Sequence, residues 1–487
     1  MIISIIIILG CFLAVIILII TNKLNRAISS LFGAVITYFV LVFIEGFDFS
    51  VIVELLFGSP PPPSSPFEGF VNLHSLIIII GMMMIVQIAH EAGTFQFIAV
   101  KLIKFSRGKP TVLLIIFCTV TVFISAILNN ILTVIIIIPL TITVSRILNI
   151  NPSPYILTQA VLVNIGGTIF SISSIPNILI TTFANIEFLE FFLNVGILSL
   201  IVFILTLCFF ILLYKGELKV PEEGVQVLKE FNVWNVVQNK RLFYQSIISL
   251  IILFALLIII PSTIISSDII TLAIALILII ITRLDPKNII SKIDFELIFY
   301  LLGIFIIVGG LEITGVTDVI GNSILNLGGN NFYLQIILLL WFSAYLSSCI
   351  DNIPITKVLI PVADTMSLSV SPSTRSQFFY SLALGANWGD NLTPLGDNIL
   401  VGNLAEQNKR PISFKSFFKL GFITTNYQIA IITTYYTLIF YTQVGFILLS
   451  TIIFIILIAY LINKFGPTKI KSRFNSFFSK SREIIIR

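Results

Sequence analysis

The sequence predicts an all-α integral membrane protein, and composition and apolar periodicity together carry that prediction. Of the 487 residues, 57% are hydrophobic and only 10% are charged, whereas a soluble domain carries roughly 25% charged residues. The mean hydropathy is +1.09. So few ionisable groups cannot cover a water-soluble globule of this length, which excludes a cytosolic enzyme, a nucleic-acid-binding protein and a disordered chain.

The apolar runs define the expected elements, because a helix crosses the roughly 30 Å hydrocarbon layer with about 20 apolar residues. About eleven full spans are expected by that measure. They lie near 2–20, 27–45, 73–89, 154–176, 191–214, 243–261, 266–282, 295–311, 376–401, 420–441 and 443–463. Two further apolar stretches, 110–149 and 333–370, are interrupted at their middles by polar residues.

Basic loop residues predict the orientation, since Lys and Arg concentrate on the cytoplasmic side. Lys23 and Arg26 follow the first span, so the N-terminus is expected outside and the strongly basic C-terminal tail in the cytoplasm. Basic loops stay on the cytoplasmic side along the whole chain only if 110–149 and 333–370 each return to the side of the membrane from which they entered. This favours two re-entrant hairpins, although two full spans in each place would give the same parity.

An internal repeat relates two parts of the chain. Three pairs of windows match, at offsets of 222, 222 and 223: GMMMIVQIAHEAGTFQFI from 81 with GIFIIVGGLEITGVTDVI from 303, SAILNNILTVIIIIP from 125 with SSCIDNIPITKVLIP from 347, and NIGGT from 164 with NWGDN from 387. An odd number of spans separates the copies, which predicts opposite membrane orientations. Inverted repeats with interrupted helices are typical of secondary transporters, whereas a channel usually arises from ring symmetry of subunits.

The repeat gives the expected organisation of the chain. The parts are N-terminal scaffold helices in 1–72, a first inverted repeat in 73–214, a cytoplasmic linker in 215–242, scaffold helices in 243–294, a second inverted repeat in 295–441, and a last helix with a basic tail in 442–487.

Four polar islands interrupt the apolar runs. They are Asn129-Asn130, 164–177, Asp351-Asn352 and 387–398. In hydrocarbon a broken helix survives only where it lines a cavity or is buried against protein. The glycines and prolines of these islands free backbone carbonyls, and half-helix ends add partial charges. The islands therefore predict a small-ion site at mid-membrane depth, with interhelical hydrogen bonding as the alternative role of each Asn, Ser or Thr.

The charged residues of the islands lie in the second half. A carboxylate at bilayer depth is expensive and by default functional, which points to Asp351, Asp390 and Asp397, although Asp397 could instead reach a headgroup. Lys357 follows Asp351 by six positions across Pro354. It could neutralise a carboxylate, or stand where a sodium ion would otherwise sit.

These motifs resemble the hairpins and discontinuous helices of the ion transporter superfamily with a citrate-transporter-like domain. The nearest branches are the arsenite permease and P-protein branch and the D-type sodium–proton antiporters. The resemblance covers about 70–440. It implies an elevator-type transporter that is a homodimer, with possible Na⁺ sites at the Asn130 and Asn352 hairpin tips. The sequence departs from the family pattern in several respects. The arsenite branch usually reads Asp-Asn at the first tip, where this chain has Asn129-Asn130, and Gly-Asp-Pro-Pro-Asn after the first GGT, where this chain reads SSIPN over 173–177. The second half has Asp390 and Asp397 where the family more often has uncharged small residues, and Lys357 is also unusual.

The resemblance and the islands together give the candidate substrate- or ion-binding residues. The resemblance implies a first half-site of Ser125, Asn129, Asn130, Gly167 and Thr168 and a second of Ser347, Asp351, Asn352, Gly389 and Asn391. The islands add Asn164, Asn387, Asp390, Thr393 and Asp397, with Lys357 as a charge-coupling residue.

The function expected from these residues is secondary active transport of a small inorganic ion or oxyanion, such as Na⁺ or arsenite, coupled to a proton or sodium gradient. Sodium-coupled uptake of a citrate-like di- or tricarboxylate is the alternative. It ranks lower, because three Asp residues would repel such an anion unless each is neutralised. A hypothesis from a different functional class is that the protein is a membrane scaffold that transports nothing. No cofactor, nucleic-acid partner or catalytic set is expected, and without a Walker motif any ATP drive would need a separate subunit.

Overall fold

The computed structural model describes residues 2–21, 23–48, 71–106, 109–214, 232–368, 370–393, 398–409 and 411–451. All regular secondary structure in these ranges is helical, as the sequence predicts. Most of the predicted linker, the last helix beyond Thr451 with its basic tail, and Asp397 lie outside the described residues.

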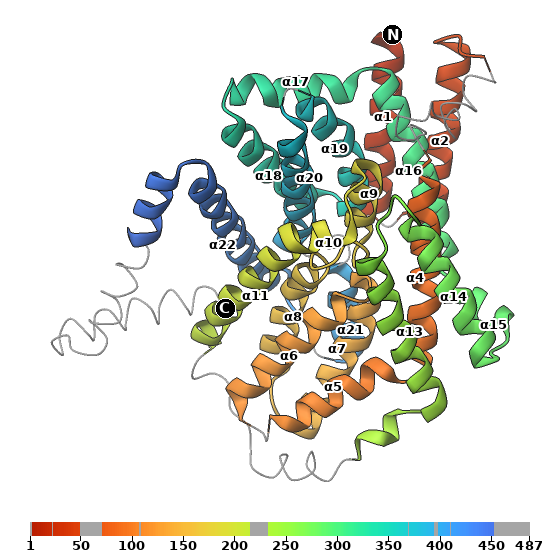
Figure 1. The fold of residues 1–487 in the computed structure, drawn as a ribbon, viewed down its shortest axis with the longest axis vertical. Helices are drawn as coiled ribbons and strands as arrows, with labels where there is room; N and C mark the ends of the chain where they lie inside the picture. Colours follow the sequence, from red (N-terminus) through yellow and green to blue (C-terminus); the bar gives the residue numbers. More distant parts are fainter. Residues whose placement is uncertain are drawn as a thin grey trace.

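Two helical pairs each pack against one long helix of the other half of the chain (Figure 1). The pair α1 (Ile2–Ile20) and α2 (Arg26–Phe43) packs on α16 (Phe295–Ile313), and the pair α13 (Lys240–Ile259) and α14 (Ser267–Thr282) packs on α4 (Leu73–Glu91). Glycines permit the close approach of these helices. A Cβ on Gly303 would lie 2.5 Å from the backbone of Ser30, and one on Gly81 would lie 3.0 Å from the Thr271 side chain.

The long helices α4 and α16 end in the same way. Each is followed by a glycine with φ of +76°, Gly93 after α4 and Gly315 after α16. This left-handed conformation favours glycine and redirects the chain into the short amphipathic helices α5 (Thr94–Phe105) and α17 (Val316–Gly328).

Two helical hairpins follow these short helices. The first joins α6 (Pro110–Ser125) to α7 (Asn130–Ile147), and the second joins α18 (Phe332–Cys349) to α19 (Asn352–Ser367). The side chains of Asn129 and Asp351 cap the returning helices, which satisfies amide groups that a new helix start leaves unpaired. Figure 1 shows α6 and α7 in the lower half of the molecule and α18 and α19 in the upper half.

Two predicted spans are wrong in extent, because polar islands end their helices early. The helix expected over 154–176 stops at Gly166 (α8, Ser153–Gly166), and α9 (Ile175–Ala184) starts anew with Ser174 as its cap. The helix expected over 376–401 stops at Gly389 (α20, Pro372–Gly389), continues as the 3₁₀ turn η3 (Asp390–Leu392) and is followed by α21 (Asn398–Gln407). Thr393 is extended, as expected for a residue that precedes a proline.

The remaining helices complete the bundle. They are α10 (Phe188–Phe191), the π-helical η1 (Phe192–Gly196), α11 (Ile197–Tyr214), the 3₁₀ turn η2 (Val233–Val236), α15 (Pro286–Ile290) and α22 (Phe414–Phe440). The segments α10, η1 and α11 form one continuous apolar helix, which agrees with the span predicted over 191–214.

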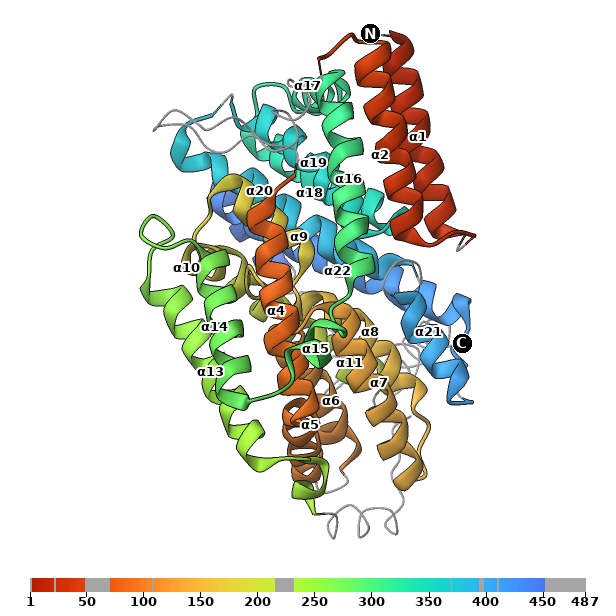
Figure 2. The same ribbon diagram turned by 90° about the vertical axis from the view of Figure 1, so that its right-hand side faces the viewer.

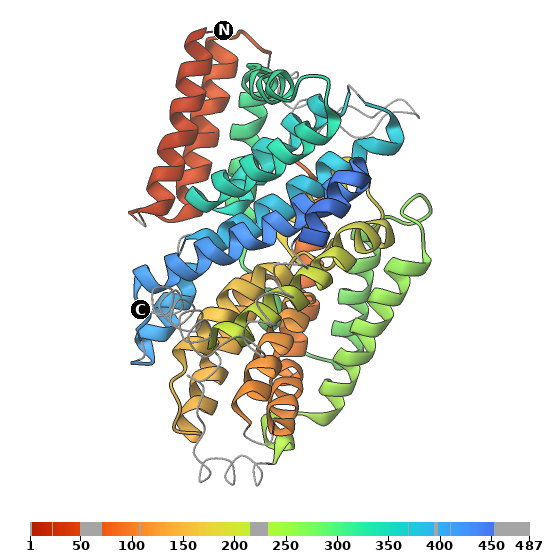
Figure 3. The same cartoon turned by 90° about the vertical axis from the view of Figure 1, so that its left-hand side faces the viewer.

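Eight helices of the described ranges are long and apolar enough to cross a membrane. They are Ile2–Ile20, Arg26–Phe43, Leu73–Glu91, Asn130–Ile147, Phe188–Tyr214, Lys240–Ile259, Phe295–Ile313 and Phe332–Cys349. Such a set is that of a multi-pass membrane protein. Figures 2 and 3 show the α1–α2 and α13–α14 pairs at diagonally opposite corners, with the hairpins and broken helices between them.

Candidate functional site

Three helix starts meet at the centre of the molecule. A small cavity of about 20 Å³ is lined by the first residues of α7 (Asn129 to Ile131), α9 (Ser174 to Pro176) and α19 (Asn352 and Ile353). This volume admits about one water-sized particle. Helix N-termini carry partial positive charge, while the amide and hydroxyl groups around the cavity supply oxygen atoms. The sequence places these residues in three separate islands, and the structure brings all three together.

The first half holds its island together with short hydrogen bonds. Ser125 Oγ donates to the carbonyl oxygen of Val163 at 2.6 Å, and Asn130 Nδ2 donates to Asn164 Oδ1 at 2.5 Å. Gly167 is tightly enclosed, because a Cβ there would lie 2.7 Å from Asn130 Oδ1. The hairpin tip and the α8–α9 break are therefore one polar unit.

The second half repeats the serine contact of the first at the repeat offsets, and a similar asparagine contact recurs with its donor at an offset of 221. Ser347 Oγ donates to the carbonyl oxygen of Ala386 at 2.6 Å, as Ser125 does to Val163. Asn398 Nδ2 donates to the Asp390 carbonyl at 2.8 Å, and in the first half Asn177 Nδ2 donates to the Gly167 carbonyl, also at 2.8 Å.

Glycines bring further helices against both breaks. A Cβ on Gly389 would lie 2.1 Å from the Ala344 carbonyl oxygen of α18. A Cβ on Gly196 would lie 2.3 Å from the Ile169 carbonyl oxygen, and one on Gly421 would lie 2.1 Å from that of Asn391. Since each neighbour is a backbone atom, any side chain at these positions would displace a helix that supports the island.

The two hairpin tips differ in one pairing. Asn352 and Asn387 occupy the positions of Asn130 and Asn164, yet Asn387 Nδ2 instead donates to Asn177 Oδ1 at 2.8 Å. Asn352 Nδ2, Asn387 Oδ1 and Asn391 Nδ2 are buried, and within the described ranges they have no hydrogen-bond partner. Buried polar atoms of this kind are costly unless a ligand, ion or water satisfies them. The asparagines of the second tip therefore have unused binding capacity that the matching Asn130 and Asn164 lack.

Asn164 joins the two halves. Its Nδ2 donates to Asn391 Oδ1 at 2.7 Å and lies 3.3 Å from Asp390 Oδ2, while its Oδ1 accepts the bond from Asn130. Asp390 is 2% exposed. A second link runs from Trp388 Nε1 to Thr168 Oγ1 at 3.1 Å. One asparagine thus contacts a hairpin tip of its own half and a carboxylate of the other.

Asp351 faces a much larger cavity of about 550 Å³. Its other walls come from the α1–α2 turn with Lys23 and Arg26, the start of α16 with Glu296 and Tyr300, and part of α21. The exposed thiol of Cys349 also lines it. In contrast, the cavity beside the first tip, against α4, measures only about 30 Å³.

Two remaining candidate residues, Thr393 and Lys357, lie beside the polar cluster of the second half. Thr393 Oγ1 donates to the Ser348 carbonyl at 2.6 Å and joins the α20 break to α18. Lys357 is buried on α19, with Nζ 5.0 Å from the centre of the Phe305 ring of α16. The structure therefore places Lys357 at a contact between the second hairpin and α16, away from the asparagine cluster.

Three contributors to the site are missing from the sequence-based set. Asn177 and Asn398 close the two breaks, and both stand at the ends of polar islands, so the repeat could have identified them. Trp388 is fully buried, and a buried indole N–H needs a partner. Its partner, Thr168, lies in the other half, and no spacing in the sequence signals that contact.

The oxygen atoms of the polar cluster are of the kind that bind hard cations. Groups of three or more His, Cys, Asp or Glu side chains able to hold a metal are absent from the described part of the chain. Asparagine, hydroxyl and carbonyl oxygens with one carboxylate are instead ligands for a cation such as Na⁺. In the second half these donors are Asp390, Asn387 and Asn391, beside Asn164 of the first half.

Comparison with known proteins shows which family this chain resembles. A family model described as "Citrate transporter" matches residues 16–375 and 254–473. A 46 kDa membrane protein of Mycobacterium leprae is 28% identical over 417 residues, 85% of this chain and 94% of that protein. An uncharacterized transporter of Mycobacterium tuberculosis is 29% identical over 359 residues, 73% of this chain and 83% of that protein. The human P protein is 25% identical over 440 residues, 72% of this chain and 52% of that protein.

Proposed function

Because this chain belongs to the citrate transporter family, a family of membrane transporters and not of enzymes, we propose that it is a secondary active transporter of a small inorganic ion or oxyanion, such as Na⁺ or arsenite. Transport is coupled to a proton or sodium gradient. The observation that carries the proposal is the polar cluster at the hairpin tips, where Asn164 contacts Asn130 and Asp390. A carboxylate in such a desolvated place binds a cation or a proton.

The two halves act as inverted repeats in this proposal. Two observations support that relation. Ser125 of α6 and Ser347 of α18 make matching hydrogen bonds, and each helical pair packs on a helix of the other half, α2 on α16 and α14 on α4. The moving part consists of the hairpins and the broken helices. The scaffold consists of α1, α2, α4, α13, α14 and α16, and an elevator displacement of one against the other carries the ion across the bilayer of a homodimer.

The orientation follows from the basic loops. With the N-terminus outside, the α1–α2 turn with Lys23 and Arg26 is cytoplasmic. The large cavity beside Asp351 then opens toward the cytoplasm, and the narrow cavity beside Asn129 is the closed side. With this orientation we assign the structure to an inward-facing state and the C-terminal tail to the cytoplasm.

A citrate-like carboxylate is the second candidate substrate. The large cavity supports it, because about 550 Å³ is ample for a tricarboxylate and Lys23 and Arg26 lie on its wall. The unpaired amide donors of Asn352 and Asn391 would suit carboxylate oxygens. Asp351 and Asp390 oppose it unless a coupling cation neutralises them.

Reconstitution into liposomes that contain a pH-sensitive dye tests the proposal. Sodium, lithium, arsenite and citrate are added in turn under an imposed proton gradient, and Asn164→Ala is the matched inactive variant. A proton flux evoked by Na⁺, Li⁺ or arsenite supports the main proposal, whereas flux with citrate alone supports the second. Absence of flux with all four solutes, or full activity of Asp351→Asn, contradicts it and favours a non-transporting scaffold.

A further inference from the structure

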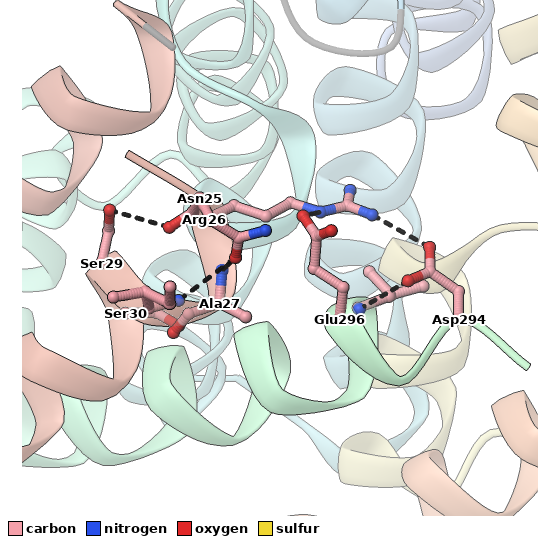
Figure 4. A network of polar contacts seen from close by, with 9 residues as sticks. Asn25, Arg26, Ala27, Ser29, Ser30, Asp294 and Glu296 are labelled. Carbon is pink, nitrogen blue, oxygen red and sulfur yellow. Dashed lines mark hydrogen bonds and ion pairs between the residues drawn. The ribbon is translucent and has the colours of Figure 1, made fainter. Parts of the chain in front are cut away.

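One arginine ties the start of α2 to the start of α16 (Figure 4). Arg26 Nη2 donates to Asp294 Oδ2 at 3.0 Å, and Nε donates to Glu296 Oε1 at 3.1 Å. The guanidinium carbon lies 5.9 Å from the centre of the Tyr300 ring. Because α16 supplies or adjoins all of these contacts, the arginine has a fixed position on the scaffold. A guanidinium has five N–H donors, so these two bonds leave capacity for a third acceptor.

The second hairpin offers a further carboxylate, that of Asp351, for this capacity. Arg26 and Asp351 both line the large cavity, Arg26 at the α1–α2 turn and Asp351 at the tip of the second hairpin. Their charges also interact across it. Lys23 also lines this cavity, but the charge that interacts with Asp351 is that of Arg26, and Lys357 lies over the Phe305 ring. Arg26 is therefore the cation that faces Asp351 from the scaffold.

We propose that Arg26 is a positioning residue that holds the tip of the second hairpin in this conformation through Asp351, and that the hairpin leaves only when a cation or a proton takes over the neutralisation of Asp351. The inference rests on the proposed function and adds a coupling device to it. Asp351 is half-buried, and a carboxylate that leaves water without its counter-charge is strongly disfavoured. Movement of the empty, charged hairpin is thereby suppressed, and movement of the ion-loaded hairpin is allowed.

Cys349 provides a probe of hairpin position that needs no knowledge of the transported ion. This thiol is exposed in the large cavity, two residues before Asp351. In the purified full-length protein with Cys11, Cys118 and Cys208 replaced by alanine, the labelling rate of Cys349 by a hydrophilic maleimide measures how often the tip lies at this cavity. Arg26→Gln should slow labelling roughly 1.5- to fivefold, the range expected when one partly exposed ion pair no longer biases the equilibrium.

The Asp351→Asn variant identifies the partner. It should slow labelling as much as Arg26→Gln, and the double variant should be no slower than either single variant, because both changes remove one interaction. An electrostatic effect on the thiolate alone would have opposite signs in the two single variants. Arg375→Gln is the matched control, since Arg375 pairs with Asp364, and it should leave the rate unchanged.

A purely structural role of Arg26 predicts a different result. If Arg26 only joins α2 to α16, the variant Asp294→Asn/Glu296→Gln should slow labelling as Arg26→Gln does, and that result would overturn the inference. Additive slowing in the Arg26→Gln/Asp351→Asn protein would overturn it as well. Arg26→Lys, which keeps the cation, should label faster than Arg26→Gln. The liposome assay fails or succeeds independently of these rates, so loss of the proposed function and loss of this inference are distinguishable.

Discussion

Asn164 is the residue whose removal should affect both halves of the protein at once. Asn164→Ala deletes the acceptor of the 2.5 Å bond from Asn130 and the donor of the 2.7 Å bond to Asn391. It also removes the 3.3 Å contact with Asp390. Interhelical hydrogen bonds in membranes contribute on average about 0.6 kcal/mol each. Buried partners left unsatisfied add about 1–3 kcal/mol each, so a loss of about 3 kcal/mol of stability is expected.

The assay is thermal unfolding of the purified protein in detergent, followed by the liposome flux measurement. Asn426→Ala is the control, because Asn426 bonds Tyr345 at an exposed position and should change stability by less than about 0.5 kcal/mol. The Asn164→Ala protein should unfold at a clearly lower temperature and lose transport. Unchanged unfolding and unchanged flux in this variant would refute the view that Asn164 connects the halves.

Three further predictions concern individual residues of the second half. Gly389→Ala should destabilise the protein by about 2 kcal/mol or more in thermal unfolding, since its Cβ would meet the Ala344 carbonyl oxygen at 2.1 Å, whereas Gly402→Ala, which meets nothing within 4 Å, should be neutral or stabilising. Asp351→Asn should lower ion-coupled flux at least tenfold in liposomes while the protein still purifies as a folded species; wild-type flux would contradict the assignment. Lys357→Met should retain at least half of wild-type flux, because the lysine packs on an aromatic ring outside the asparagine cluster; complete loss would place its charge in the coupling step.

The sequence suffices for the class of the protein and for the position of its polar islands, for a physical reason. Hydrocarbon admits so few polar groups that Asn129, Asn130 and Asp351 stand out from apolar runs by composition alone. Helix ends are less visible. The break after Gly166 depends on the Ser174 cap and on packing against other helices, and a window of average hydropathy extends across it.

Contacts between the halves could not be predicted from spacing. Asn164 lies 226 residues before Asp390, and only the folded arrangement of hairpins and broken helices brings them together. The contact of Lys357 with the Phe305 ring has the same origin, because that ring belongs to α16, a separate helix. The repeat predicts that Asn352 and Asn387 are equivalent to Asn130 and Asn164, but it cannot reveal that the second pair is left unbonded.

The two left-handed glycine turns have unequal evolutionary freedom, although their backbone angles agree. At Gly315 a Cβ would meet nothing within 4 Å, while at Gly93 it would lie 2.2 Å from the Val236 carbonyl oxygen, just before α13. Asparagine tolerates the left-handed region better than other L-residues. Descendants of this gene can therefore exchange Gly315 for asparagine at small cost, whereas position 93 admits glycine alone for as long as the segment from η2 to α13 stays docked there.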